Sequence, residues 1–167
     1  MYNTIGEFIK EWNYEMNSTQ KVFDALTDKS LEVEISPDGR TLGRVAWHIV
    51  TNIPQYLSKF GFIIETVKDP ATIPSSAKEI AERFREVSAA AVETVNKQWT
   101  NESLEKIQDA FGRDLSNAEI LTLLIKHIVH HRGQMTVLMR KAELRVPGVY
   151  GPAREEWSQM GMEAPAL

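Results

Sequence analysis

Three of the four histidines in this chain, His127, His130 and His131, fall within the short stretch HIVHHRGQ. Residues four apart on a helix share one face, with Cβ atoms about 5–6 Å from each other. His127 and His131 have this spacing, so their imidazoles can converge on one metal ion. His130 is turned away by about a third of a turn, and we expect it at the rim of that face.

A packed core position is the alternative for each of these histidines. Two neutral imidazoles buried side by side each need a hydrogen-bond partner, however, and one metal ion satisfies both. The remaining histidine, His48, is the candidate third ligand. It falls at the edge of the apolar stripe of its own helix, so a rim position is the alternative for it.

The residues that follow His131 allow two interpretations each. Arg132 is either a group that orients an anionic ligand or a solvated helix residue. Gln134 either hydrogen-bonds a ligand imidazole or bonds to a neighbouring helix. Gly133 costs a helix about 1 kcal/mol relative to alanine, which suggests the close approach of another backbone.

Four helices are expected to position these residues. Apolar residues recur with helical periodicity in four segments, at about 4–26, 42–67, 76–99 and 116–144. Side chains that suit a helix N-cap open all four, namely Thr4, Thr41, Ser76 and Ser116. Pro54 lies inside the second segment, where it should kink or break the helix.

The pattern predicts an all-α fold, a four-helix bundle formed by a single domain over residues 1–167. The connecting loops are long for a simple up-and-down bundle, which suggests a crossover connection. We expect the tail from Pro147 onward to be ordered coil lying on the bundle.

Helix four also carries Ile125, Val129 and Met139 away from the histidine face. Such a wide apolar arc must be covered by the tail or by a second copy, and we predict a homodimer.

Composition narrows the classes of function. The chain has 167 residues, a formal net charge of -4 and no cysteine. It therefore has no disulfide, no thiolate metal ligand and no cysteine nucleophile. A negative net charge argues against a nucleic-acid partner. No apolar run approaches the roughly 20 residues that span a bilayer, and the N-terminus lacks the pattern of a signal peptide. We expect a cytoplasmic protein without a membrane partner.

Three stretches resemble the DinB-like superfamily of metal-binding helical bundles over nearly the whole chain. They are His-x-x-x-His-Arg-Gly-Gln at 127–134, RTLGRVAWHI ending near His48, and the closing MRKAELRVPGVYGPAREEW. The resemblance implies that His48, His127 and His131 bind one divalent metal ion. It places varied residues at the position of His130.

Three histidines without a fourth protein ligand leave a coordination position open, as in catalytic zinc sites. Zinc and nickel are the ions we expect first, although histidine ligands also suit copper and iron. The resemblance implies a metal-dependent transferase that joins a low-molecular-weight thiol to a small-molecule substrate. Two alternatives stay open. One is a metal-dependent hydrolase, and the other is a non-catalytic, stress-associated protein that binds a metal or ligand.

Overall fold

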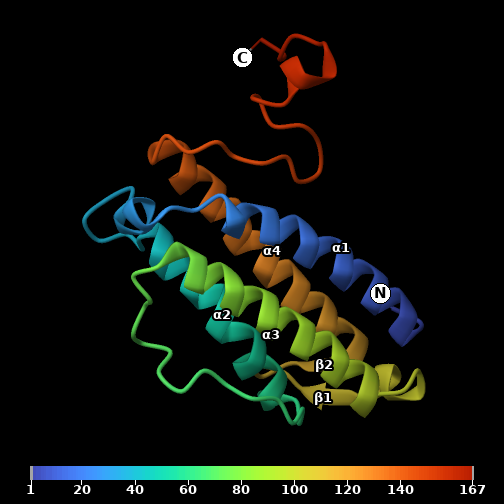
Figure 1. The fold of residues 1–167 in the computed structure, drawn as a ribbon. Helices are drawn as coiled ribbons and strands as arrows, with labels where there is room; N and C mark the ends of the chain where they lie inside the picture. The colour runs from blue at the N-terminus through green and yellow to red at the C-terminus, as the bar shows by residue number, and fades with distance from the viewer. Residues whose placement is uncertain (1, 167) are drawn as a thin grey trace.

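The computed structural model describes residues 2–166, and four long helices packed side by side dominate it (Figure 1). They are α1 (Ile5–Asp24), α2 (Leu42–Lys59), α3 (Ala77–Gln98) and α4 (Asn117–Lys141). The predicted four-helix bundle is confirmed. None of the described helices is long and apolar enough to cross a membrane.

The helices begin where the sequence indicated. The N-cap side chains accept hydrogen bonds from the backbone N–H three residues on, at Thr4, Thr41, Ser76 and Ser116. Each cap satisfies one of the amide donors that a helix start leaves without a partner. Ser116 and Glu119 form a reciprocal capping box that fixes the start of α4. Because the start of α4 is fixed, the direction in which each of its histidines points around the helix axis is fixed as well.

The predicted end of the second helix was wrong. α2 ends at Lys59, not near Val67. Gly61 takes a left-handed conformation with φ of +85°, and the chain then turns so that the Phe62 ring packs 4.4 Å from Trp99, centroid to centroid. The helix continues through Pro54 instead of breaking there. Its apolar stripe continues past Lys59 in sequence, but glycine at the turn ends the helix.

Each helix of the bundle has two main neighbours. α1 packs against α3 and α4, and α2 packs against the same two helices, so α1 and α2 lie diagonally opposite each other. The α1–α2 connection contains the 3-10 helix η1 (Asp28–Glu32). The α3–α4 connection contains η2 (Glu102–Glu105) and a hairpin of β1 (Ile107–Asp109) and β2 (Asp114–Ser116). Both connections must cross the bundle, which explains their length.

The short hairpin was not expected from the sequence. Its two strands are antiparallel, with Ile107 opposite Ser116. It leads directly into the capping box of α4, and Asn117 at the start of α4 donates from its side chain to the Ser103 carbonyl. The hairpin and η2 therefore anchor the end of α4 that precedes the histidines.

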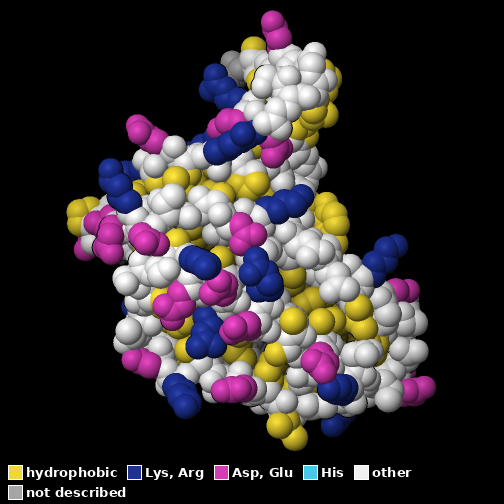
Figure 2. Space-filling view, viewed as in Figure 1, with side chains coloured by type: hydrophobic (Ala, Val, Ile, Leu, Met, Phe, Trp, Pro, Cys, Tyr) yellow, Lys and Arg dark blue, Asp and Glu magenta, His cyan; other side chains and the backbone are white. Residues whose placement is uncertain are grey.

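The expectation for the tail holds only for its first part. Val149 is partly buried against the core, and the Tyr150 hydroxyl donates to the Glu15 carboxylate on α1. Beyond this point the chain reaches away from the bundle, through η3 (Trp157–Met160), which has no buried residue (Figure 1). Figure 2 shows basic and acidic side chains interspersed on the face that it presents.

The observation behind the predicted homodimer has another explanation. Ile125 and Met139 are buried within the single chain, and Val129 is partly buried. α4 contacts α1, α2, η2 and β2, so these elements cover its wide apolar arc. The homodimer stays a prediction without that support.

Gly133 is exposed and a Cβ there would meet nothing within 4 Å, so the close backbone approach predicted for it is wrong.

Candidate metal centre

α2 and α4 pack against each other and bring three histidines together. His48 comes from α2, and His127 and His131 lie one turn apart on α4. A ligand nitrogen from each of the three lies within 4.8 Å of the other two. The ring centroids of His48 and His131 are 4.5 Å apart, as are those of His127 and His131. The three rings thus form one cluster between the two helices.

The spacing of the nitrogens suits a shared metal ion. His48 Nε2 lies 3.1 Å from His127 Nε2. Two nitrogens that each lie about 2.0–2.1 Å from a tetrahedral ion are about 3.3 Å from each other. In the metal-free protein, one of these two nitrogens carries a proton and donates a hydrogen bond to the other. The donor set and the separation both fit a divalent ion with imidazole ligands.

Gln134 fixes the orientation of His131. Its Oε1 lies 2.7 Å from His131 Nδ1, and its Nε2 lies 3.1 Å from His130 Nε2. An amide oxygen can only accept a hydrogen bond, so His131 Nδ1 carries the proton. The lone pair of His131 Nε2 is then free for a metal. Outer partners of this kind hold ligand histidines in the correct tautomer. His130 itself is exposed and outside the cluster.

The surroundings keep the three histidines neutral. Burial lowers the pKa of His48 to about 4, with further contributions from His131, His127 and Arg40. Burial is also the main cause of the lowered pKa of His127 and of His131. A neutral imidazole is the form that binds metal. The cluster is therefore in its metal-binding form at neutral pH.

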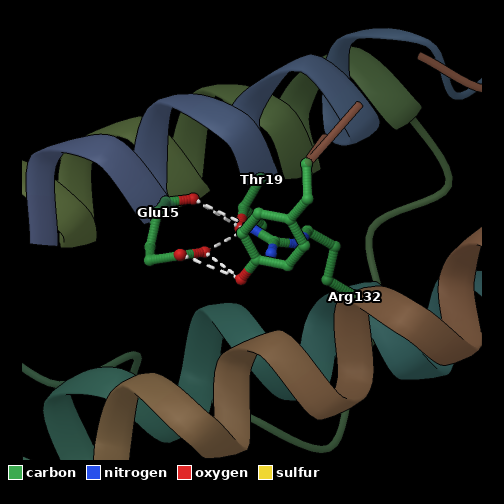
Figure 3. A network of polar contacts seen from close by, with 4 residues as sticks. Glu15, Thr19 and Arg132 are labelled. Carbon is green, nitrogen blue, oxygen red and sulfur yellow. Dashed lines mark hydrogen bonds and ion pairs between the residues drawn. The ribbon is translucent and has the colours of Figure 1, made fainter. Parts of the chain in front are cut away.

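Arg132 is in neither of its two predicted settings. Its side chain is only 3% exposed and points to α1 (Figure 3). The guanidinium lies 2.8 Å from the Glu15 carboxylate, and it donates to the Glu15 carbonyl and to Thr19 Oγ1. The ring of Tyr150 covers it at 5.0 Å. Arg132 thus ties α4 to α1 and to the tail.

Sequence reasoning did not single out Arg40 or the cavity beside it. Arg40 precedes the N-cap of α2, about two helical turns before His48, and its charge lowers the pKa of all three histidines. It lines a cavity of about 380 Å³ together with Gln134. No local sequence signal marks this cavity, because its walls come from a loop and two helices.

A larger cavity lies elsewhere and is not the metal centre. It measures about 610 Å³ and lies between α3 and the loop that follows α2. Trp47 forms part of its wall, but none of the histidines does. The chemistry of the imidazole cluster, not the size of a cavity, identifies the candidate site.

Three histidines make up the candidate ligand set among the described residues. Among residues 2–166, no carboxylate belongs to it, and none hydrogen-bonds to its histidines. Structural zinc sites use four protein ligands, whereas catalytic sites use three and keep one position open. The arrangement is thus of the open type.

Comparisons with known proteins agree with the fold. The model of the DinB family matches residues 1–164. YrdA of Bacillus subtilis (strain 168) is 42% identical over 167 residues, the whole length of both chains. The crystal structure of a DinB-like protein from Bacillus cereus has a TM-score of 0.85 and 53% identity, covering 90% of this chain and 100% of that one.

A more distant structure shares the fold alone. YfiT from Bacillus subtilis has a TM-score of 0.62 at 15% identity, covering 83% of this chain and 87% of that one. That protein is described as a probable metal-dependent hydrolase with an unusual four-helix bundle topology.

Proposed function

Since the chain belongs to the DinB family, we propose that it is an enzyme that holds one divalent metal ion with His48, His127 and His131. The convergence of three neutral imidazoles, without a fourth protein ligand among the described residues, carries this proposal. Zinc and nickel are the ions we favour, because both bind imidazole well. Affinity alone does not choose between them.

The residues of the chain have distinct tasks in this proposal. The three histidines hold the ion, and Gln134 keeps the His131 Nε2 lone pair directed into the cluster. Partial burial keeps the imidazoles unprotonated and excludes part of the solvent. When bound, a divalent ion supplies Lewis acidity that lowers the pKa of a coordinating water or thiol.

Transfer of a small external thiol to an electrophilic substrate is the reaction we favour. The chain has no cysteine, so the thiol must come from outside. Among the described residues no carboxylate hydrogen-bonds to the histidines, so a carboxylate general base is not in place beside them. A thiol close to its thiolate form does not need such a base, whereas activation of water usually benefits from one.

A conjugation assay tests this reaction. Protein loaded with zinc or nickel is mixed with small thiols and chlorodinitrobenzene. The thiol sulfur displaces chloride from the ring and its proton goes to the buffer, and the coloured thioether is followed by absorbance. Conjugation should exceed the uncatalysed rate, should be lost in His127→Ala, and should persist in His130→Ala as the matched control. An absence of acceleration with every thiol tried would contradict the transferase proposal.

Hydrolysis is the second candidate, and the description of YfiT favours it. Turnover of a nitrophenyl ester without added thiol, lost in His127→Ala, would support the hydrolase in place of the transferase. If the metal-loaded protein turns over neither substrate, a non-catalytic, stress-associated binding protein becomes the better description. The same preparations serve for both assays, so their results are directly comparable.

A further inference from the structure

The cavity of about 380 Å³ beside the histidines has an apolar floor and one charged wall. Buried Val45 and Leu138 form its floor, and exposed Ile35 and Val137 form its rim. Arg40 supplies the charge. Small-molecule sites are concave and mostly apolar, with a few polar groups that fix the orientation of the ligand, and their volumes begin at about 300 Å³. The cavity is therefore large enough for a small organic molecule.

One side chain joins the cavity to the candidate metal centre. Gln134 lines the cavity and accepts the hydrogen bond of His131 Nδ1 at 2.7 Å. A molecule held in the cavity thus lies next to the group that orients a histidine of the cluster.

Arg40 is suited to bind an anion. None of the ion pairs among residues 2–166 includes it, although the chain pairs several of its other arginines. A guanidinium presents its N–H donors in a planar fork that matches a carboxylate or a phosphate. Arg40 is exposed, so its guanidinium is accessible to an anion that enters the cavity.

We propose that this cavity binds the anionic end of the substrate, with Arg40 holding a carboxylate or phosphate and Val45 and Leu138 contacting an adjoining apolar group. The substrate class is then a small, partly apolar organic anion. This inference rests on the proposed function only in calling the ligand a substrate. Binding of the anion depends on Arg40 and the cavity walls, which are not metal ligands.

A binding experiment tests the inference on the metal-free and the zinc-loaded protein. Phenylacetate and phenyl phosphate are titrated in parallel with phenylacetamide, a neutral molecule of similar shape, and the Val45 and Leu138 methyl signals are followed by NMR. One or both anions should shift these signals and bind at least about 10-fold more tightly than the amide, because a charged hydrogen bond is the stronger one.

Two variants make the test specific. Arg40→Gln should remove the preference for the anion in both metal states. Arg44→Gln is the matched control and should keep it, because the Arg44 guanidinium donates to the Ala71 carbonyl and does not line the cavity. Equal affinity for anions and amide, or an unchanged preference in Arg40→Gln, would overturn the inference.

The experiment distinguishes failure of the cavity assignment from failure of the proposed metal centre. If the protein binds no zinc but the metal-free form still prefers the anion through Arg40, the cavity assignment stands and the metal proposal fails. If zinc binds but neither anion shifts Val45 or Leu138, the metal proposal stands and the cavity assignment fails. Shifts confined to the histidines in the zinc-loaded protein would also overturn the cavity assignment.

Discussion

His131 and Arg132 are consecutive in the sequence, yet they serve two different neighbours of α4. The His131 ring lies 4.5 Å from that of His48 on α2, whereas the Arg132 guanidinium lies 2.8 Å from the Glu15 carboxylate on α1. A rotation of about 100° per residue produces this division, because α4 packs between the two diagonal helices. One dipeptide therefore combines a candidate metal ligand with a buried ion pair.

Removal of Arg132 should destabilise the fold without directly removing a metal ligand. In Arg132→Met, the Glu15 carboxylate stays buried without its cation, which typically costs about 3–5 kcal/mol of unfolding free energy. Urea denaturation of the metal-free protein measures this loss. The double variant Glu15→Gln/Arg132→Met should regain a substantial part of it. A loss below about 1 kcal/mol in the single variant would mean that the pair is unimportant to stability.

Gln134 should tune metal affinity. Gln134→Leu removes the acceptor of the His131 Nδ1 proton, and loss of such a partner typically weakens metal binding about 10–100-fold. Gln134→Glu keeps an acceptor at the same position and should retain most of the affinity. Zinc titration by calorimetry compares the two variants. Equal affinities of the leucine and glutamate variants would show that the amide does not support the site.

Each ligand histidine should be needed for metal binding. His48→Ala, His127→Ala and His131→Ala should each weaken zinc binding by more than the loss of an outer partner does, because an ion–nitrogen bond is lost directly. His130→Ala should keep its metal, since His130 is exposed and lies outside the group of three nitrogens that converge. Elemental analysis of reconstituted protein gives the metal content. Full zinc occupancy in His48→Ala would show that α2 supplies no ligand to the metal.

The lowered histidine pKa values predict how the metal-free protein responds to acid. In the unfolded chain these imidazoles take up protons near pH 6.5, whereas His48 in the folded state does so near pH 4. As the pH falls below about 6.5, the unfolded state therefore binds more protons, and stability declines until about pH 4. Thermal unfolding at several pH values measures this decline. The slope should flatten in His48→Ala.

The same pKa values bear on the pH dependence of metal binding. Because the pKa of each of the three histidines is lowered, and that of His48 to about 4, zinc affinity should decline only below the ordinary histidine pKa of about 6.5. A loss centred at the ordinary histidine value, about pH 6.5, would show that the imidazoles are solvated.

Local signals in the sequence were sufficient to predict the four helices and the placement of His127 and His131 on one face of α4. Thr4 and Ser116 mark helix starts through hydrogen bonds to residues only three positions away, and the spacing of His127 and His131 is a property of one helix. The end of α2 was missed because apolar residues continue past Lys59. The left-handed turn at Gly61 ends the helix although the apolar periodicity continues.

Long-range contacts account for the features that were missed. The hydrogen bonds between Arg132 and α1 join residues more than a hundred positions apart, and nothing near Arg132 in the sequence indicates Glu15 as its partner. Arg40 is brought near the histidines by the α1–α2 connection, which crosses the bundle. Periodicity describes one helix at a time and does not say which of its neighbours each side chain will meet.

The most direct test of the three-histidine site is anomalous diffraction at the zinc edge from crystals of the zinc-loaded protein. We expect one strong peak between α2 and α4, at bonding distance from nitrogens of His48, His127 and His131, with His131 bound through Nε2 and no fourth protein side chain on the ion. A peak elsewhere, a fourth ligand from the chain, or no peak in fully folded protein would contradict the proposed open metal centre.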